Sequence, residues 1–184
     1  MIRAVLDANV YISAAVRPEG PPGQIIDRFL RGGAFEIVMS QAIVDEVLRA
    51  LSYPKVRKYI RPGLDPELWF EDIVVLSHLV AGEHEFAGAS KDPDDDKYIA
   101  AAIEGRAGFV VAGDSDLLDL KEYDGIRIVS PRVFLDLRPS DRSPSARAAP
   151  AESGDSTGDP SRVSRRGPAW ASLGQDRSLR RPRE

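Results

Sequence analysis

The fold of this chain is indicated by the stretch PDDDKYIAAAIEGRAGFVVAGD, residues 93–114. Its first half predicts a helix, because Asp92 can cap it, Pro93 suits a first helical position, and apolar residues then recur at helical spacing. Its second half holds the short apolar run Phe109 to Ala112, which predicts a buried strand ending at Gly113 and Asp114. A helix that leads directly into a buried strand is the repeating unit of parallel α/β sheets.

The same alternation continues on both sides of this stretch. Short apolar runs predict strands at 2–6, 35–39, 78–80 and 126–129, in addition to 109–112. Helical periodicity predicts helices at 25–30, 40–51, 65–76, 93–104, 115–120 and 131–137. We therefore expect a three-layer α/β/α fold with a central, mostly parallel sheet of four or five strands.

Composition divides the chain into two parts. Of its 184 residues 42% are hydrophobic, which is enough for one domain with a substantial core. Residues 139–184 hold almost no Ile, Val, Leu or Phe and are rich in Ser, Pro, Gly, Ala and Arg. Such a segment buries too little apolar area to offset its chain entropy. We expect one folded domain at 1–138 and a disordered low-complexity tail at 139–184.

Charge and cysteine content exclude some classes of function. Residues 1–138 carry sixteen Lys and Arg against twenty-three Asp and Glu, so this part of the chain is acidic. A negative net charge argues against binding of nucleic acid by net charge, but it suits an acidic pocket for divalent cations. Without cysteine, neither a disulfide framework nor a thiolate metal site can form. Because no apolar run suggests a signal peptide or a membrane span, the expected location is the cytoplasm.

Asp96 is the first acid that capping does not explain. It lies three, four and seven residues before Ile99, Ala100 and Ile103, which places it on the apolar side of the predicted helix. A carboxylate turned inward costs several kcal/mol, on the order of the desolvation penalty of a buried ion, unless a cation or donor compensates it. Asp96 therefore suggests a cation site.

Further acids are expected at the same edge of the sheet. Asp7 ends the first strand, Asp114 follows the strand 109–112, and Asp116 opens the next helix. Ligand sites of open parallel sheets form at the carboxyl ends of the strands. Each acid alone is commonly a helix cap or a solvated loop residue. Their coincidence with Asp96 at one edge favours a functional site.

The helix at 40–51 offers a fourth acid, Asp45 or Glu46. Both lie on the flanks of its apolar stripe, on opposite sides. Asp45 has Arg49 four residues later, as in a solvated ion pair. Glu46 is flanked by the small residues Ala42 and Ala50, which leave room for a ligand to approach. The pattern favours Glu46.

Four motifs together resemble a known family. MIRAVLDANVYISAAV, SQAIVDEVLRAL, DPDDDKYIAAA and VVAGDSDLL, in this order and spacing, resemble the PIN-domain ribonucleases, and among them the bacterial VapC-like toxins of toxin-antitoxin pairs. The similarity covers about residues 1–137. It implies that the family's acids correspond to Asp7 with its polar companion Asn9, to Glu46, to Asp96, and to the pair Asp114 and Asp116. Ala112 departs from the pattern, because many relatives have Ser or Thr there.

The resemblance implies a metal-dependent endoribonuclease that a cognate antitoxin protein holds inactive and that can form homodimers. Its catalytic residues would be Asp7, Glu46, Asp96 and Asp114, and its metal ligands Asp7, Asp96, Asp114 and Asp116. Clustered carboxylates repel one another, and oxygen-only ligands suit Mg²⁺ or Mn²⁺ better than zinc. We expect one of these two ions as the cofactor.

A basic segment, SYPKVRKYIRPG at residues 52–63, is a candidate contact for RNA. It interleaves tyrosines with the cations Lys55, Arg57, Lys58 and Arg61, a combination that can bind phosphates and stack bases. A solvated basic face with packed tyrosines is the alternative interpretation. Arg17 is a weaker candidate of the same kind.

Two other classes of function are compatible with these acids. A catalytically inactive PIN-like module that binds nucleic acid or regulates a partner would keep the fold, and Ala112 leaves this possibility open. A phosphoacceptor receiver domain also gathers acids at strand ends. It needs a lysine after the last strand, where this chain has Ser130, Pro131 and Arg132.

Overall fold

The computed structural model describes residues 1–84 and 93–137. The capping role predicted for Asp92 and the predicted tail at 139–184 lie outside the described residues. Within them the elements follow in the order β1 (Ile2–Leu6), α1 (Ala8–Val16), α2 (Pro21–Gly32), β2 (Phe35–Ser40), α3 (Gln41–Ser52), α4 (Pro54–Arg57), α5 (Pro66–Leu76), β3 (His78–Val80), the 3₁₀ helix η1 (Pro93–Asp95), α6 (Asp96–Glu104), β4 (Phe109–Val111), α7 (Ser115–Asp119), β5 (Glu122–Tyr123), β6 (Ile126–Val129) and α8 (Pro131–Asp136).

The strands form one sheet in the order β3-β2-β1-β4-β6-β5. All neighbours are parallel except β5 and β6, which are antiparallel. The chain builds outward from β1 through β2 to β3 and then returns to the other side of β1 with β4. The strand order therefore reverses between β1 and β4, and ligand sites of open α/β sheets form at the carboxyl ends of such a strand pair.

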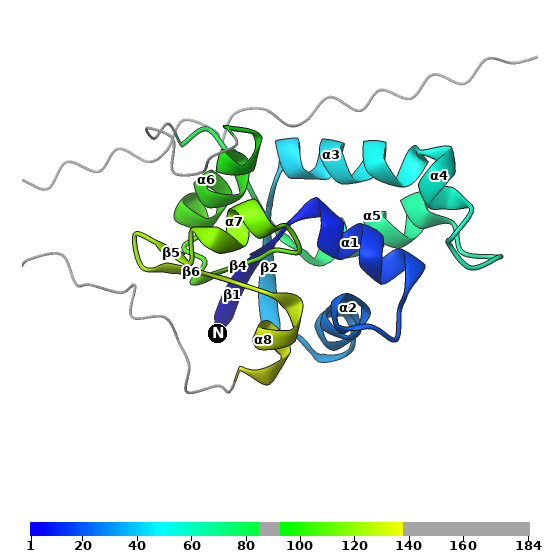
Figure 1. Ribbon diagram of the computed structural model, residues 1–184, viewed down its shortest axis with the longest axis horizontal. Helices are drawn as coiled ribbons and strands as arrows, with labels where there is room; N and C mark the ends of the chain where they lie inside the picture. Colours follow the sequence, from blue (N-terminus) through cyan, green and yellow to red (C-terminus); the bar gives the residue numbers. More distant parts are fainter. Residues whose placement is uncertain (85–92, 138–184) are drawn as a thin grey trace, which may run out of the picture. The chain divides into compact units, whose positions relative to one another are not determined.

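Burial of the central strands explains their apolar sequences. Residues 4–6 of β1 and 109–111 of β4 are at most 1% exposed. Strands covered on both faces need apolar side chains on both, which gives continuous apolar runs instead of alternation. The helix α6 packs against β1, β2, β4 and β6, and α1 and α2 lie on the other side of the central strands (Figure 1). The predicted α/β class with a mostly parallel sheet and flanking helices is confirmed.

The structure differs from the sequence prediction in several places. The sheet has six strands among the described residues instead of four or five, because β5 forms a hairpin with β6. Asp124 and Gly125 join the two strands with positive φ angles of 46° and 78°, as a two-residue hairpin turn requires. The helix predicted at 93–104 begins as the 3₁₀ helix η1 and becomes an α-helix at Asp96. The helices α1 and α4 were not predicted.

The helix α1 escaped prediction because it lacks a polar stripe. Five of its nine residues are buried: Ala8, Val10, Tyr11, Ala14 and Ala15. A helix that is apolar on most sides shows no clear 3.6-residue pattern in the sequence. Among the described helices, none has the length and the apolar character that are needed to cross a membrane.

Candidate active site

Asp7 occupies the point where the strand order reverses. It follows β1 and caps α1, and its side chain is almost fully buried, with 2% of the residue exposed. Its Oδ1 accepts a hydrogen bond of 3.1 Å from the Val10 amide, and its Oδ2 accepts one of 2.7 Å from the Gly113 amide. The carboxylate is therefore fixed between the start of α1 and the loop after β4.

Burial changes the protonation of Asp7. Desolvation raises the pKa of its carboxyl from 3.8 to about 6, against the opposing effect of backbone amides, of which Gly113 contributes most. Burial disfavours the charged form of an acid, whereas donors and nearby cations favour it. A cation bound beside Asp7 would restore a fully ionised carboxylate at neutral pH. The site thus has the electrostatic character of a cation site.

Glu46 points from α3 toward α6. Its Oε2 accepts a hydrogen bond of 2.6 Å from the Tyr98 hydroxyl and lies 3.1 Å from Nζ of Lys97. The preceding residue, Asp45, is exposed and accepts a hydrogen bond of 2.8 Å from the Gln41 side chain. Of the two acids that the sequence left in competition, Glu46 is the one that faces the other candidate residues.

Tyr98 is a site residue that sequence reasoning missed. It is 3% exposed, and its hydroxyl also accepts a hydrogen bond of 3.1 Å from the Ala8 amide. Burial and the hydrogen bond to Glu46 raise the pKa of Tyr98, so the phenol stays neutral and keeps its proton to donate. Since a buried tyrosine hydroxyl usually needs a partner, a tyrosine two residues after Asp96 was the available signal.

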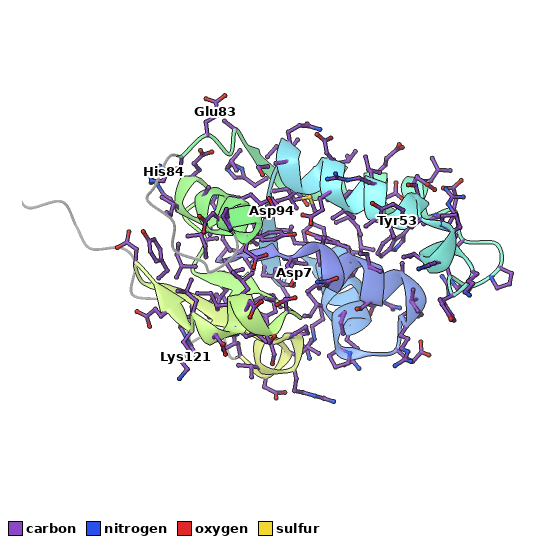
Figure 2. The ribbon with its side chains drawn as sticks, turned by 45° about the horizontal axis from the view of Figure 1, so that its top comes forward. Asp7, Tyr53, Glu83, His84, Asp94 and Lys121 are labelled. Atoms are coloured by element: carbon purple, nitrogen blue, oxygen red, sulfur yellow. The ribbon has the colours of Figure 1, made fainter. Side chains whose placement is uncertain are left out.

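Asp96 is the first residue of α6 and is half-buried. Ile99 and Ala100, with which it was predicted to share the apolar side, are buried. Asp96 is therefore partly turned inward, at the edge of the core. It lies two residues before Tyr98, whose hydroxyl reaches both Glu46 and the amide next to Asp7. Figure 2 labels Asp7 at the start of α1 and Asp94 just before α6.

Asp114 and Asp116 lie on the exposed side of the site. Asp114 directly follows Gly113, whose amide binds Asp7. It caps the short helix α7 by accepting a hydrogen bond of 2.8 Å from the Asp116 amide. Asn9 is exposed, and a Cβ placed on Gly113 would lie 3.7 Å from the Asn9 Cβ. Asn9 and Asp114 thus lie next to Gly113, whose amide binds Asp7.

The acids converge on one edge without forming a finished metal site. Within residues 1–84 and 93–137, no three His, Asp or Glu side chains are grouped closely enough, as placed, to hold a metal ion. The donors that the fold brings to this edge are carboxylate oxygens, which suit Mg²⁺ and Mn²⁺.

The predicted RNA-contacting cations are all exposed, and four of them lie on α4 or just after it: Lys55, Arg57, Lys58 and Arg61. Arg57 forms an ion pair with Glu67, so its charge is partly compensated. Arg17 ends α1 at its C-cap, on the same helix that Asp7 begins.

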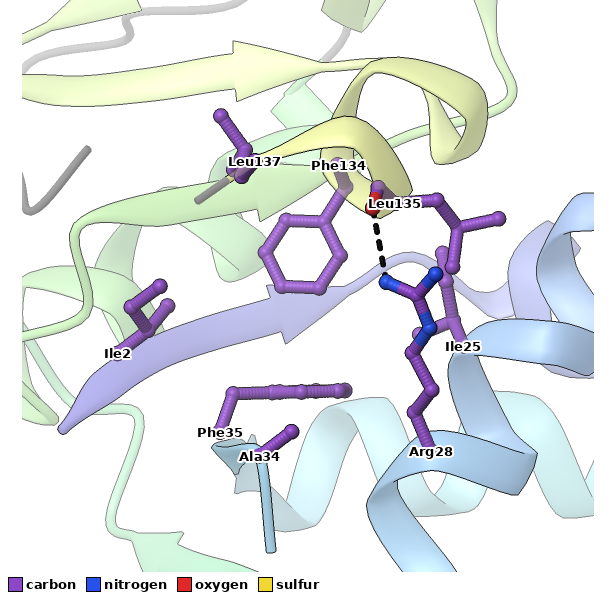
Figure 3. Close-up of a pocket in the computed structure, with 8 residues that line it drawn as sticks. All are labelled: Ile2, Ile25, Arg28, Ala34, Phe35, Phe134, Leu135 and Leu137. Atoms are coloured by element: carbon purple, nitrogen blue, oxygen red, sulfur yellow. Dashed lines mark hydrogen bonds between the residues drawn. The ribbon is translucent and has the colours of Figure 1, made fainter. Parts of the chain in front are cut away.

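A separate apolar cavity lies at the other end of the sheet. Its volume is about 60 Å³, and Ile2 of β1 and Phe35 of β2 contribute from the amino ends of their strands (Figure 3). Arg28 also lines this cavity and donates a hydrogen bond of 2.8 Å to the Leu135 carbonyl. Because Asp7 follows the carboxyl end of β1, this cavity is not part of the acidic site.

Proteins similar to this chain include one sequence relative and one solved structure. A protein of Methanocaldococcus jannaschii, named as uncharacterized protein MJ1680, is 26% identical over 145 residues, which cover 73% of this chain and 90% of that protein. The crystal structure of VapBC2 from Rickettsia felis bound to a DNA fragment from their promoter has a TM-score of 0.45 and 10% identity, with 70% of this chain and 98% of that chain covered. That structural likeness is too distant to support an argument about function.

The family itself is identified by a sequence model of the PIN domain, which matches residues 3–116. The matched range contains Asp7, Glu46, Asp96, Asp114 and Asp116. Since this match spans more than half of the chain, the protein belongs to the PIN-domain family.

Proposed function

We propose that this protein is a metal-dependent endoribonuclease that hydrolyses phosphodiester bonds of RNA. Asp7, Glu46, Asp96 and Asp114 form its catalytic set, with Asp116 as a further metal ligand. Membership of the PIN-domain family supports a nuclease. The observation that carries the proposal is the buried Asp7 carboxylate, which lies at the reversal of strand order with its pKa raised to about 6.

The residues present fit Mg²⁺ or Mn²⁺. Among the described residues, no cation lowers the raised pKa of buried Asp7, and the other candidate donors of the site are oxygen atoms of Asp96, Asp114 and Asp116. The chemistry that such an ion supplies when bound is Lewis acidity toward water and toward a phosphate oxygen. We assign Asp7, Asp96, Asp114 and Asp116 as the residues that hold it.

The chain's own residues then position the reactants. Two backbone amides fix the orientation of Asp7 before any ligand arrives. Tyr98 and Lys97 hold one oxygen of Glu46, which leaves its other oxygen to orient an attacking water or to accept its proton. Lys97 also places a positive charge beside the site, where an anionic phosphate would bind.

The biological context of the proposal comes from the family resemblance. We propose that the protein acts on RNA in the cytoplasm as the toxin of a toxin-antitoxin pair, with an antitoxin protein as its partner. A homodimer is part of the same proposal. The receiver-domain alternative is displaced by the PIN-domain match, which covers both Asp7 and Asp114.

An inactive nucleic-acid-binding or regulatory module is the second candidate. It is favoured by Ala112, which is fully buried beside the loop to Asp114 and offers no hydroxyl to orient a carboxylate or a water. The inactive module is also compatible with the finding that, among the described residues, no three acids are grouped closely enough to hold a metal ion.

Cleavage assays on purified full-length chain separate these candidates. End-labelled single-stranded RNA is incubated with Mg²⁺, with Mn²⁺, or with EDTA, and the products are resolved on denaturing gels. We expect cleavage with either ion, none with EDTA, and loss of cleavage in Asp7→Asn and Glu46→Gln. The matched control is Asp45→Asn, which changes the exposed neighbour of Glu46 on the same helix. Cleavage that persists in Asp7→Asn comes from a contaminant and would leave the inactive module as the better explanation.

A further inference from the structure

A surface hollow opens where α1 ends. It has a volume of about 490 Å³ and is lined by Ile12, Ser13, Val16, Arg17 and Tyr59. The first four residues belong to the last turns of α1 and its C-cap, whereas Tyr59 follows α4. The fold thus brings the weakest of the predicted RNA-contacting residues, Arg17, next to the basic segment at 52–63.

The chemistry of the hollow suits an unpaired nucleotide. Tyr59 is 65% exposed, so its ring is accessible to a ligand. Nζ of Lys58 lies 5.1 Å from the centre of the Tyr59 ring, and Arg17 is exposed on the other segment. An exposed aromatic ring between cations stacks a base and binds the adjoining phosphates. Ile12 and Val16 add apolar contact area for the base.

The hollow is connected to the acidic site by one side of α1. The helix begins at its cap Asp7 and ends at its cap Arg17, with nine residues between them, a rise of roughly 14 Å. Asn9 and Ser13 are exposed and Val16 is half-exposed, and their spacing of four and three residues places them on the same side of the helix. This side offers a path from Asn9, beside Asp7, to the hollow.

We propose that the hollow between Arg17 and Tyr59 is a subsite for single-stranded RNA, in which a base stacks on Tyr59 while Arg17 and Lys58 contact phosphates. The strand then runs along α1 toward Asp7. This inference rests on the proposed function for the identity of its ligand. A duplex does not fit the same role, because its bases are stacked on one another and cannot reach the tyrosine ring.

The subsite is tested by binding, which does not require cleavage. The full chain with Asp7→Asn binds a fluorescently labelled single-stranded RNA of about ten nucleotides, and anisotropy is measured over a range of salt concentrations. We expect Tyr59→Ala to weaken binding about tenfold, whereas Tyr59→Phe, which keeps the ring, stays within about twofold. Arg17→Gln should reduce the slope of log affinity against log salt by about one, as loss of one phosphate contact does.

Matched controls are exposed residues of the same types that do not line the hollow. Tyr53→Ala removes another exposed tyrosine, 52% exposed, from the same basic segment. Arg132→Gln removes an exposed arginine from α8. Both variants should bind single-stranded RNA as tightly as the chain with Asp7→Asn alone. Duplex RNA of equal length should bind to that chain more weakly than the single strand does.

The proposal is overturned if Tyr59→Ala binds RNA as tightly as the reference chain with Asp7→Asn alone, or if Tyr53→Ala weakens binding equally. It is also overturned if the reference chain prefers the duplex or binds neither RNA. The subsite would be supported and the nuclease refuted if the chain with Asp7→Asn binds single-stranded RNA through Tyr59 but the wild-type chain cleaves no RNA. The two failures are therefore distinguishable.

Discussion

Tyr98 donates its hydroxyl proton to Oε2 of Glu46 across 2.6 Å and thereby joins α6 to α3. The same hydroxyl accepts a hydrogen bond from the amide of Ala8, the residue after Asp7. One buried phenol therefore connects the three segments that carry Asp7, Glu46 and Asp96. Since hydrogen bonds of this kind orient the groups that bind metals and substrates, Tyr98 should matter for activity although it carries no charge.

Replacing Tyr98 by Phe tests this connection. The ring remains, but Glu46 loses a donor and the Ala8 amide loses its acceptor. We expect the cleavage rate at saturating RNA to fall about tenfold or more, with little change in KM, and the free energy of unfolding to fall by about 1 kcal/mol. Steady-state kinetics and urea unfolding measure the two effects. Tyr53→Phe, at an exposed position, should change neither, and an unchanged rate in Tyr98→Phe would refute the positioning role.

The positive charge of Lys97 beside Glu46 should oppose the binding of a divalent cation at the acidic site. The ammonium of Lys97 lies 3.1 Å from Oε2 of Glu46, and both side chains are partly exposed, 24% and 30%. Removing the lysine charge leaves the acidic edge more negative. We expect Lys97→Met to bind Mn²⁺ roughly fivefold more tightly in titration calorimetry, since a partly exposed pair is worth up to about 1 kcal/mol. Lys55→Met, on exposed α4, is the control. Equal or weaker binding in Lys97→Met would show that Glu46 and Lys97 stand apart from the metal.

The stability of the metal-free protein should depend on pH through Asp7. Its carboxyl has a pKa of about 6 in the folded chain against 3.8 for the unfolded reference, so between these values the folded state holds a proton that the unfolded state has lost. The contribution of Asp7 is therefore greatest below pH 3.8 and is lost as pH rises through 6. The loss amounts to about 3 kcal/mol, in order of magnitude, at 1.4 kcal/mol per pKa unit.

Urea unfolding in EDTA at pH 4.5 and pH 7.5 measures this loss. Other carboxylates also titrate in the range, so the informative quantity is the difference between wild type and Asp7→Asn at each pH. We expect the wild type to lose stability relative to Asp7→Asn as pH rises. A constant difference would mean that Asp7 is ionised throughout and that its burial does not shift its pKa.

The affinity for divalent cations should change with pH in the opposite direction. A metal ion binds the ionised carboxylate, so a proton on Asp7 competes with it. With a pKa of about 6 for this carboxyl, Mn²⁺ should bind about tenfold more weakly at pH 5 than at pH 7.5. Titration calorimetry at the two pH values, with proton release measured in buffers of different ionisation enthalpy, checks this. Absence of proton release at pH 5 would exclude Asp7 as a ligand.

Sequence analysis predicted the features that follow from the pattern of buried residues within one strand or one helix. Buried strands such as β1 and β4 need apolar runs, and an acid at the end of each run indicated the edge where Asp7 and Asp114 lie. A helical wheel favoured Glu46 over Asp45, because small neighbours mark the side that another element approaches. The Asp-Gly pair at 124–125 was a usable signal for the β5 and β6 hairpin that the prediction overlooked.

Other features depend on contacts between distant segments, which the spacing of residues in the sequence does not show. A tyrosine on the apolar side of α6 looks like a core residue until its hydroxyl is seen to reach Glu46, 52 residues away in sequence. The hollow between Arg17 and Tyr59 depends on how the end of α1 meets the segment after α4. Sequence spacing also cannot set side-chain rotamers, which decide whether the acids form a metal site.

Close packing at the end of α6 gives a prediction about the scaffold that carries Lys97 and Tyr98. A Cβ on Gly105 would lie 2.3 Å from Cγ1 of Val38, in buried β2, although the backbone angle of Gly105 suits any residue. We expect Gly105→Ala to lower the free energy of unfolding by about 1–3 kcal/mol through overpacking. The control is Gly32→Ala, at the end of α2, where nothing lies within 4 Å of the added methyl group and where helix propensity predicts a change of at most about 1 kcal/mol, in the stabilising direction. Urea unfolding of both variants in EDTA measures the contrast, and equal stabilities would show that α6 can move away from β2 without cost.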